Sequence, residues 1–225
     1  MKRYKLLITN ALLAGLAACT KVDDPFVDRV VAPVLVVIDN AMGDGGGQTG
    51  EPVVSQKVAG PVTLATPPGC TRIDVETARE MAAAVAAALP ADAAILVAAV
   101  ADWRVASTAQ KLKKDASSQP PVLHLVENPD ILATLAHGPQ RPGLLIGFAA
   151  ETESVIANAQ SKLARKGCDW IVANDVSGDV MGGHANTVHI VTADGVDSWP
   201  MATKSSVAGR LVTTIADTLA GKRPV

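Results

Sequence analysis

The 225-residue sequence has few aromatic residues, with two Phe, three Trp and one Tyr. The core must therefore be built mainly from aliphatic side chains. The formal net charge is also small, −2 at pH 7, which gives no electrostatic case for a nucleic-acid partner. The length suffices for one α/β domain with a sizeable core, either alone or with an extension.

Cysteine and histidine are scarce too, with three and four residues. Cys19, Cys70 and Cys168 are far apart in the chain and fit neither a disulfide framework nor a zinc-binding spacing. Cys70 and Cys168 stand beside glycines, and we predict that both thiols are unreactive. The histidines show neither an i,i+4 pair nor an HExxH pattern, so a metal site built from histidine is not expected.

The first residues resemble a bacterial lipoprotein signal. Residues 1–5 are basic, residues 6–14 are mostly apolar, and small residues lead up to Cys19, where such signals are cleaved and the thiol takes up a lipid. The apolar run is too short to span a membrane. A buried strand at 5–9 followed by a helix rich in Ala and Leu is the alternative.

The next segment contains a predicted strand and a predicted linker. The Val-rich run at 30–37 is typical of a strand. Residues 43–50 (Gly-Asp-Gly-Gly-Gly-Gln-Thr-Gly) indicate a flexible linker. A phosphate-binding loop is the alternative, but the segment has neither the GxxxxGK[ST] nor the GxGxxG spacing. We therefore divide the chain into an N-terminal extension, 1–58, and a regular domain, 59–225.

From Ala59 onward, patterns typical of strands and helices alternate. Residues 93–100 form a continuous apolar run, as expected of a parallel strand covered on both faces, and Gly167 suits a helix end. The alternation predicts an α/β fold, a Rossmann-like, doubly wound, mostly parallel sheet that binds ligands beyond the carboxyl ends of its strands. The predicted strands are 61–64, 93–100, 122–126, 144–148, 170–173 and 187–192, and the predicted helices are 74–89, 153–166, 204–219 and one that starts at Asn128-Pro129.

Two strand ends combine small residues with an acid. Small residues after the strand at 93–100 lead to Asp102, where a ribose or a base could approach the backbone; a turn or capping role for Asp102 is the alternative. The segment 147–152 repeats the pattern, because Phe148 could stack on a base and the following helix start could bind an anion. A buried Phe148 and a first-turn acid would explain this second segment without a ligand.

Lysines near two further strand ends could neutralise phosphates. Lys111 lies with two more lysines in the segment 110–114, which could also be a solvated loop edge. Lys162 and Lys166 are four residues apart and share one helix face, although cations late in a helix also favour its dipole. Together with the strand end at 171–176, these segments indicate a nucleotide or phosphate site in an α/β domain.

In order along the chain, these motifs resemble the ligase domain of bacterial phosphopantothenate–cysteine ligase, which often occurs fused to a flavin-dependent decarboxylase. The resemblance covers residues 59–225, and nothing resembles the decarboxylase half. The motifs that carry it are 60–64 (Gly-Pro-Val-Thr-Leu), 66–69 (Thr-Pro-Pro-Gly), 73–78 (Ile-Asp-Val-Glu-Thr-Ala), 98–104, 110–114, 127–132 (Glu-Asn-Pro-Asp-Ile-Leu), 147–152 and 165–177.

The resemblance implies a two-step ligation in coenzyme A biosynthesis. The carboxylate of 4′-phosphopantothenate attacks the α-phosphate of CTP, assisted by Mg²⁺, and the amine of cysteine then displaces CMP from the acyl-cytidylate. A homodimer and a cytoplasmic location are also implied, and Lys111 would contact the phosphates and the reacting centre. The implied CTP site comprises Ala99, Asp102, Lys111, Pro129, Asp130, Ile131, Leu132, Phe148, Lys162, Lys166, Ala173 and Asn174, with the metal ligands unassigned.

The chain departs from this family at its front. The family opens with a strand, a Gly-rich turn and an Asn-x-Ser-Ser-Gly stretch before a helix, and residues 1–58 do not reproduce this pattern. We expect the first strand, loop and helix to be missing, as in a chimeric reading frame, with impaired catalysis and an exposed sheet edge. The alternatives are an exported binding or structural protein anchored through Cys19, whose ligase-like domain is catalytically dead, and a nucleotide-binding protein of other specificity.

Overall fold

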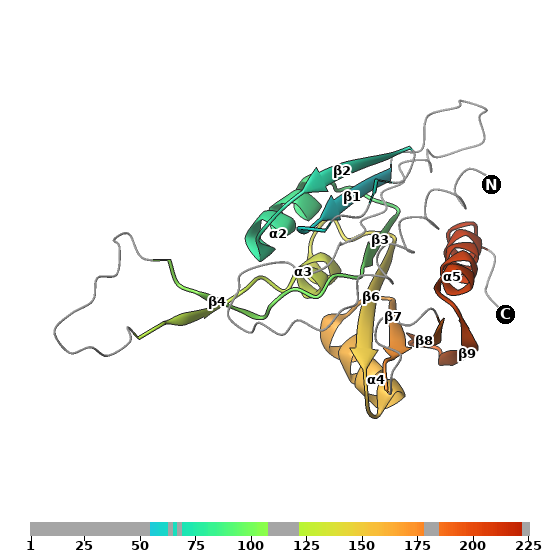
Figure 1. Cartoon of the computed structure of the whole chain (residues 1–225). Coiled ribbons are helices and arrows are strands. Elements are labelled where there is room, and N and C mark those ends of the chain that lie inside the picture. The colour runs from blue at the N-terminus through green and yellow to red at the C-terminus, as the bar shows by residue number, and fades with distance from the viewer. Residues whose placement is uncertain (1–54, 63–64, 67–68, 108–121, 178–184, 222–225) are drawn as a thin grey trace.

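The computed structural model describes residues 55–62, 65–66, 69–107, 122–177 and 185–221 (Figure 1). The predictions for residues 1–54 lie outside this part of the chain, including the signal with Cys19, the strand at 30–37 and the linker at 43–50. Lys111 lies outside it as well. Among the helices of the described ranges, none combines the length and apolar character that crossing a membrane requires.

The main sheet has five strands in the order β3-β6-β7-β8-β9. Strands β3, β6 and β7 are parallel, whereas β8 and β9 extend the sheet in antiparallel fashion. A parallel pair, β1–β2, lies beside it, and the antiparallel pair β4–β5 forms an arm that projects from the body (green in Figure 1). The strands are β1 (Ser55–Ala59), β2 (Cys70–Asp74), β3 (Ala93–Leu96), β4 (Trp103–Val105), β5 (Leu125–Glu127), β6 (Leu144–Glu151), β7 (Trp170–Asp175), β8 (Ala185–Thr192) and β9 (Val196–Thr203).

Helices cover both faces of the main sheet, because successive strand residues point to opposite sides. In β3, Ala94 packs in the core with α2, α3 and α4, whereas Ile95 packs in the core with α5. Leu145 and Ile146 of β6 divide in the same way. The predicted doubly wound α/β fold is therefore confirmed. The helices are α2 (Ala78–Ala87), α3 (Ile131–His137), α4 (Val155–Lys166) and α5 (Lys204–Leu219).

Helix α3 packs directly on β6 at Gly147. A Cβ atom at this position would lie 2.6 Å from Leu132 Cδ2 and 3.0 Å from Ile171 Cδ1. The absence of a side chain therefore lets α3 approach the strand. This close packing brings the start of α3 to the carboxyl half of the sheet.

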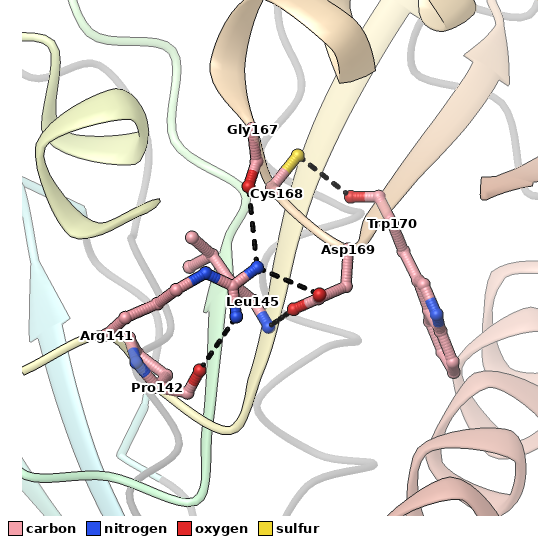
Figure 2. Close-up of polar contacts among 7 residues, drawn as sticks. All are labelled: Arg141, Pro142, Leu145, Gly167, Cys168, Asp169 and Trp170. Carbon is pink, nitrogen blue, oxygen red and sulfur yellow. Dashed lines mark hydrogen bonds and ion pairs between the residues drawn. The ribbon is translucent and has the colours of Figure 1, made fainter. Parts of the chain in front are cut away.

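One carboxylate ties β6 to β7 at their amino ends (Figure 2). Asp169 accepts a hydrogen bond of 2.7 Å from the N–H of Leu145 and one of 2.8 Å from the guanidinium of Arg141. In the opposite direction, the N–H of Asp169 donates to the carbonyl of Leu145. Because the Arg141 and Asp169 side chains are both about one third exposed, their ion pair contributes about 1 kcal/mol or less. The two hydrogen bonds between Leu145 and Asp169 join the strands at this end.

The two cysteines of the described residues are not activated. Cys168 is buried next to Asp169, and Cys70 is half-buried on β2. Burial raises the pKa of both thiols, which disfavours the nucleophilic thiolate. This agrees with the prediction that neither is reactive.

The predicted helix ends agree with the structure in part. Helix α4 ends at Gly167, which has φ +71°, and α5 has its predicted bounds. The predicted start of α2 is wrong, because Asp74 ends β2 and Thr77 caps the helix. Thr77 Oγ1 accepts from the N–H of Glu80 at 3.2 Å, and the Glu80 carboxylate accepts from the N–H of Thr77 at 3.1 Å. This capping box is the sequence signal that was overlooked.

Helix α3 starts later than predicted. The cap is Asp130 and not Asn128, because the Asp130 carboxylate accepts from the N–H of Ala133 at 3.1 Å. Pro129 consequently precedes the helix. Asn128 and Asp130 are both good caps, but the Asn128 side chain bonds to Ala101 and Arg104 instead.

The strands also differ from the prediction at several points. Residues 61–62 of the predicted strand 61–64 are not in a strand, and β1 ends before Gly60-Pro61. Strand β3 ends at Leu96, four residues early, where the backbone leaves the sheet. The predicted strand at 122–126 starts only at Leu125. Strands β1, β2, β4 and β9 were not predicted, and the exposure of most of β9 explains its lack of an apolar pattern.

Strand β1 crosses the predicted boundary between residues 58 and 59. Val58 belongs to the same core as Met81 and Val85 of α2. Among the described strands, β1 pairs only with β2, and β3 pairs only with β6. The domain boundary and the missing first strand remain predictions.

Candidate functional site

A pocket of about 440 Å³ opens where β3 and β6 approach their carboxyl ends. Its walls come from the loop after β3, the segment that joins β5 to α3, β6 and the second half of α4. Its volume lies in the range of small-molecule sites. Doubly wound sheets bind ligands at this edge, so the position agrees with the sequence prediction.

Nine of the twelve predicted site residues line this pocket. Ala173 and Asn174 do not line it, and Lys111 lies outside the described residues. That the nine bind a nucleotide remains a prediction. The nine are Ala99, Asp102, Pro129, Asp130, Ile131, Leu132, Phe148, Lys162 and Lys166, and the residues that join them are Leu96, Ala98, Val100, Ala101, Trp103, Glu127, Asn128 and Arg165.

A larger depression, of about 1540 Å³, lies at the opposite edge of the sheet. It includes Arg141 and Asp169, which already satisfy each other (Figure 2). The amino ends of parallel strands are not where this fold class binds ligands. We therefore assign the candidate site to the smaller pocket.

Asn128 fixes the two loops of the pocket against each other. Its Nδ2 donates to the carbonyl of Ala101 at 2.9 Å, and its Oδ1 accepts from Arg104 at 3.2 Å. Its backbone N–H donates to the carbonyl of Asp102 at 2.8 Å. Because Asn128 is buried, these bonds are costly to lose. They hold the loop with Asp102 beside the segment that carries Asp130.

An ion pair between Lys166 and Asp130 spans the pocket from α4 to the start of α3. Burial raises the pKa of Asp130, but hydrogen bonds from Lys166 and from the N–H of Ala133, with the charges of Lys166 and Arg165, outweigh it. The net effect holds the pKa of Asp130 below its usual range. Asp130 is therefore ionised near neutral pH, and it compensates the charge of Lys166.

Lys162 lines the same pocket. Its Nζ donates to the carbonyl of Phe148 at 2.7 Å, near the end of β6. Burial is the main cause that lowers the pKa of Lys162, and the charge of Lys166 adds to it, whereas Glu151 acts in the opposite direction. A half-buried ammonium with one neutral acceptor can interact strongly with an anion.

Ala173 and Asn174 lie on opposite faces of β7. Ala173 is fully buried in the core with α4. Asn174 is only 4% exposed, and its Oδ1 has no hydrogen-bond partner among the described residues. An unsatisfied buried acceptor is costly.

Arg165 is the cation that sequence reasoning missed. It lines the pocket and lies on α4 between the two predicted lysines. A residue three positions after Lys162 shares its helix face. This i,i+3 spacing would have found Arg165 in the sequence.

The fold and the pocket together define a Rossmann-like α/β domain with a charged site at the carboxyl edge of its sheet. The family model described as DNA/pantothenate metabolism flavoprotein C-terminal domain matches residues 49–219. The chain belongs to this family. The match begins ten residues before the predicted boundary at Ala59.

Curated relatives agree with this assignment. The chain is 39% identical over 176 residues to the coenzyme A biosynthesis bifunctional protein CoaBC of Vibrio parahaemolyticus. This match covers 76% of this chain and 44% of the relative. The chain is 40% identical over 163 residues to CoaBC of Escherichia coli strain K12, covering 70% and 40%. The chain thus spans less than half the length of these relatives.

Solved structures share the fold. The C-terminal domain of CoaBC superposes with a TM-score of 0.58 at 30% identity, covering 84% of this chain and 92% of that one. A DNA/pantothenate metabolism flavoprotein from Streptococcus pneumoniae gives a TM-score of 0.59 at 16% identity, covering 75% and 82%. A Cab2 mutant in complex with phosphopantothenate-cysteine gives 0.54 at 16% identity, covering 68% and 55%. At such low identities the last two support the fold alone.

Proposed function

We propose that the chain carries out the CTP-dependent ligation of 4′-phosphopantothenate and cysteine, giving phosphopantothenoylcysteine. The observation that carries the proposal is the charged pocket at the carboxyl edge of the sheet, in a chain that belongs to this family. Nine residues that the family resemblance assigns to CTP come from four separate segments and meet in this pocket. Such a meeting would be hard to explain if the motifs served only local structure.

The proposed reaction has two steps. The carboxylate oxygen of 4′-phosphopantothenate forms a bond to the α-phosphorus of CTP while the bond to the β-phosphate oxygen breaks, so pyrophosphate leaves. The cysteine amine then attacks the acyl carbon of the acyl-cytidylate, loses a proton and expels CMP. Activation is needed because a free carboxylate is a poor acyl donor, and cations that meet the developing phosphate charge lower the barrier.

The pocket residues divide into two proposed roles. Asp102, with the small residues before it, and Phe148 would hold the cytidine end, because a carboxylate can accept from ribose or amine groups and an aromatic ring can stack. Lys162 and Lys166 would bind the phosphates as point charges, and Lys111 would approach the reacting centre. The family resemblance also places Asn174 near the base, although its buried Oδ1 lies outside the lining of the pocket.

Mg²⁺ fits this site as a companion of the nucleotide. The described residues contain no cluster of three or more metal-ligating side chains. Mg²⁺ bound with nucleotides commonly uses one or two carboxylates together with substrate phosphates, and Asp102, Glu127 and Asp130 line the pocket. Glu127 and Asp130 would hold the ion, which would supply charge stabilisation on the phosphates.

We also propose a cytoplasmic homodimer in which the arm contacts the second copy. Trp103, Leu123 and Leu125 of the arm are between 48% and 54% exposed, and Val122 is 79% exposed. Exposed apolar side chains gathered on one projecting element favour an interaction surface. Leu125→Asp should shift the molar mass measured by light scattering from dimer to monomer, and an unchanged mass would exclude the arm.

Mass spectrometry of a complete reaction tests the proposed function. The full chain is incubated with CTP, Mg²⁺, 4′-phosphopantothenate and cysteine, and parallel samples omit cysteine or replace CTP by ATP. Phosphopantothenoylcysteine and CMP in the complete sample, with acyl-cytidylate when cysteine is omitted, would support the proposal. Product with ATP and none with CTP would contradict the nucleotide assignment. A sample with neither product nor acyl-cytidylate would contradict the ligase activity.

A further inference from the structure

Three cations of α4 line the candidate site. Lys162, Arg165 and Lys166 occupy positions i, i+3 and i+4, which share one face of a helix. All three border the pocket. Their side chains differ, however, in what they already bind.

The two lysines are committed to acceptors of the protein. Lys162 donates to the carbonyl of Phe148, and Lys166 pairs with the Asp130 carboxylate. A ligand phosphate must share these ammonium groups with their present partners or displace those partners. The lysine with the ion pair therefore contributes less uncompensated charge than its position suggests.

Arg165 is exposed and pairs with no acceptor among the described residues. Its charge nevertheless reaches the pocket, because it helps to lower the pKa of both Asp130 and Lys162. A guanidinium offers five N–H donors in a planar fork that matches phosphate oxygens. Among the described residues, Arg165 is thus the pocket cation without a protein acceptor, whereas each lysine ammonium already uses one of its three N–H donors.

We infer that Arg165 binds the outer phosphates of the nucleotide, as a phosphate-binding residue in addition to those assigned above. The inference rests on the proposed function, because it takes the ligand to be a nucleoside triphosphate. Arg165 meets the phosphates with unoccupied donors, while Lys166 remains partly held by Asp130. This difference between Arg165 and Lys166 explains how a pocket that also contains carboxylates can attract a polyanion.

A structural explanation for Arg165 predicts different behaviour. A cation late in a helix also stabilises the helix dipole, as an exposed arginine can do anywhere on the surface. Such a role would change the stability of the protein without regard to the number of phosphates on a ligand. The test must therefore compare ligands that differ only in phosphate number.

The experiment measures the binding of CMP, CDP and CTP to the full chain by isothermal titration calorimetry, with Mg²⁺ present. The variants are Arg165→Ala, Arg165→Lys and, as a matched control, Arg79→Ala, because Arg79 is exposed on α2 and does not line the pocket. We expect Arg165→Ala to weaken CTP binding about ten-fold or more, the scale of one hydrogen bond to a charged group. CMP should be affected least, Arg165→Lys should recover part of the loss, and all melting temperatures should stay close to that of the unsubstituted chain.

The outcomes test the assignment of Arg165 separately from the proposed function. A loss of affinity that grows from CMP to CTP supports the assignment of Arg165. Equal losses for all three nucleotides, or CTP affinity no weaker than in Arg79→Ala, overturn it while leaving the proposed function intact. If the unsubstituted chain binds no CTP, the proposed function fails, and the assignment of Arg165 fails with it.

Discussion

The ammonium group of Lys166, near the end of α4, pairs with the carboxylate of Asp130, which caps α3. One carboxylate thus starts a helix and holds a cation of the candidate site. Any phosphate that enters the pocket competes with Asp130 for Lys166. Substitutions at this pair can therefore separate the role of Asp130 in capping α3 from its effect on ligand binding.

Asp130→Asn should release Lys166 while keeping the cap, because asparagine caps helices as well as aspartate does. The loss of one negative charge should strengthen CTP binding without Mg²⁺ by about two- to five-fold, the scale of a partly exposed ion pair. Calorimetric titration of CTP measures the effect, with Asp197→Asn as the control, because Asp197 pairs with Arg210 away from the pocket. Weaker binding in Asp130→Asn would instead assign Asp130 a direct contact with the ligand.

CTP binding should weaken at alkaline pH because of Lys162. Burial lowers the pKa of Lys162, so this side chain loses its proton at a lower pH than an exposed lysine, and the phosphates bind the protonated form. The affinity measured between neutral pH and about pH 10 should fall as the pH rises through the lowered pKa. In Lys162→Arg, whose guanidinium stays charged, the fall should move to higher pH, and an identical profile would place the titrating group elsewhere.

Lys111→Ala should abolish the ligation with little effect on folding. Lys111 lies outside the described residues, and the expectation comes from the family motif at 110–114. Product formation by mass spectrometry and the melting temperature are measured together, with Lys204→Ala on α5 as a lysine control. Full activity in Lys111→Ala would remove Lys111 from the mechanism.

Gly147→Ala should damage both the fold and the site, because a Cβ would lie 2.6 Å from Leu132 Cδ2, and Leu132 lines the pocket. We expect the free energy of unfolding to fall by about 1–3 kcal/mol, measured by urea denaturation, together with weaker CTP binding. Gly209→Ala is the matched control, because nothing lies within 4 Å of a Cβ at Gly209, and alanine should stabilise α5 by about 0.5–1 kcal/mol. Equal effects of the two substitutions would refute the close packing of α3 on β6.

Thr77→Ala should destabilise the protein by about 1 kcal/mol through the loss of the α2 cap. Thr77→Ser should retain most of the stability that the cap contributes. Hydrogen bonds from the N–H groups of Glu76 and Thr77 lower the pKa of Glu80. Its contribution to stability is therefore present above the usual pKa of glutamate and is lost as the pH falls through the lowered value. Urea denaturation at several pH values measures both effects. If Thr77→Ala and Thr77→Ser are equally stable, the cap is not formed.

The sequence predicted the elements whose signals lie in one short segment and have no competing signal nearby. Helix α5 was found with its bounds, and the end of α4 at Gly167 followed from the left-handed conformation that glycine tolerates. The start of α3 was misplaced, because Asn128 and Asp130 are both capable caps and only packing decides between them. Strand β9 was missed because most of its side chains are exposed and show no apolar pattern.

By itself, the sequence determined the α/β class, the approximate order of strands and helices, and nine of the residues around the candidate site. Apolar runs, caps and glycine ends are properties of short segments, so they can be recognised before the chain is folded. Only the tertiary structure decided that Lys166 is held by Asp130, that Asn128 joins two loops, and that Arg165 has no acceptor among the described residues. These relationships join segments far apart in the chain, and they exist only once the packing of helices on the sheet brings those segments within hydrogen-bonding distance.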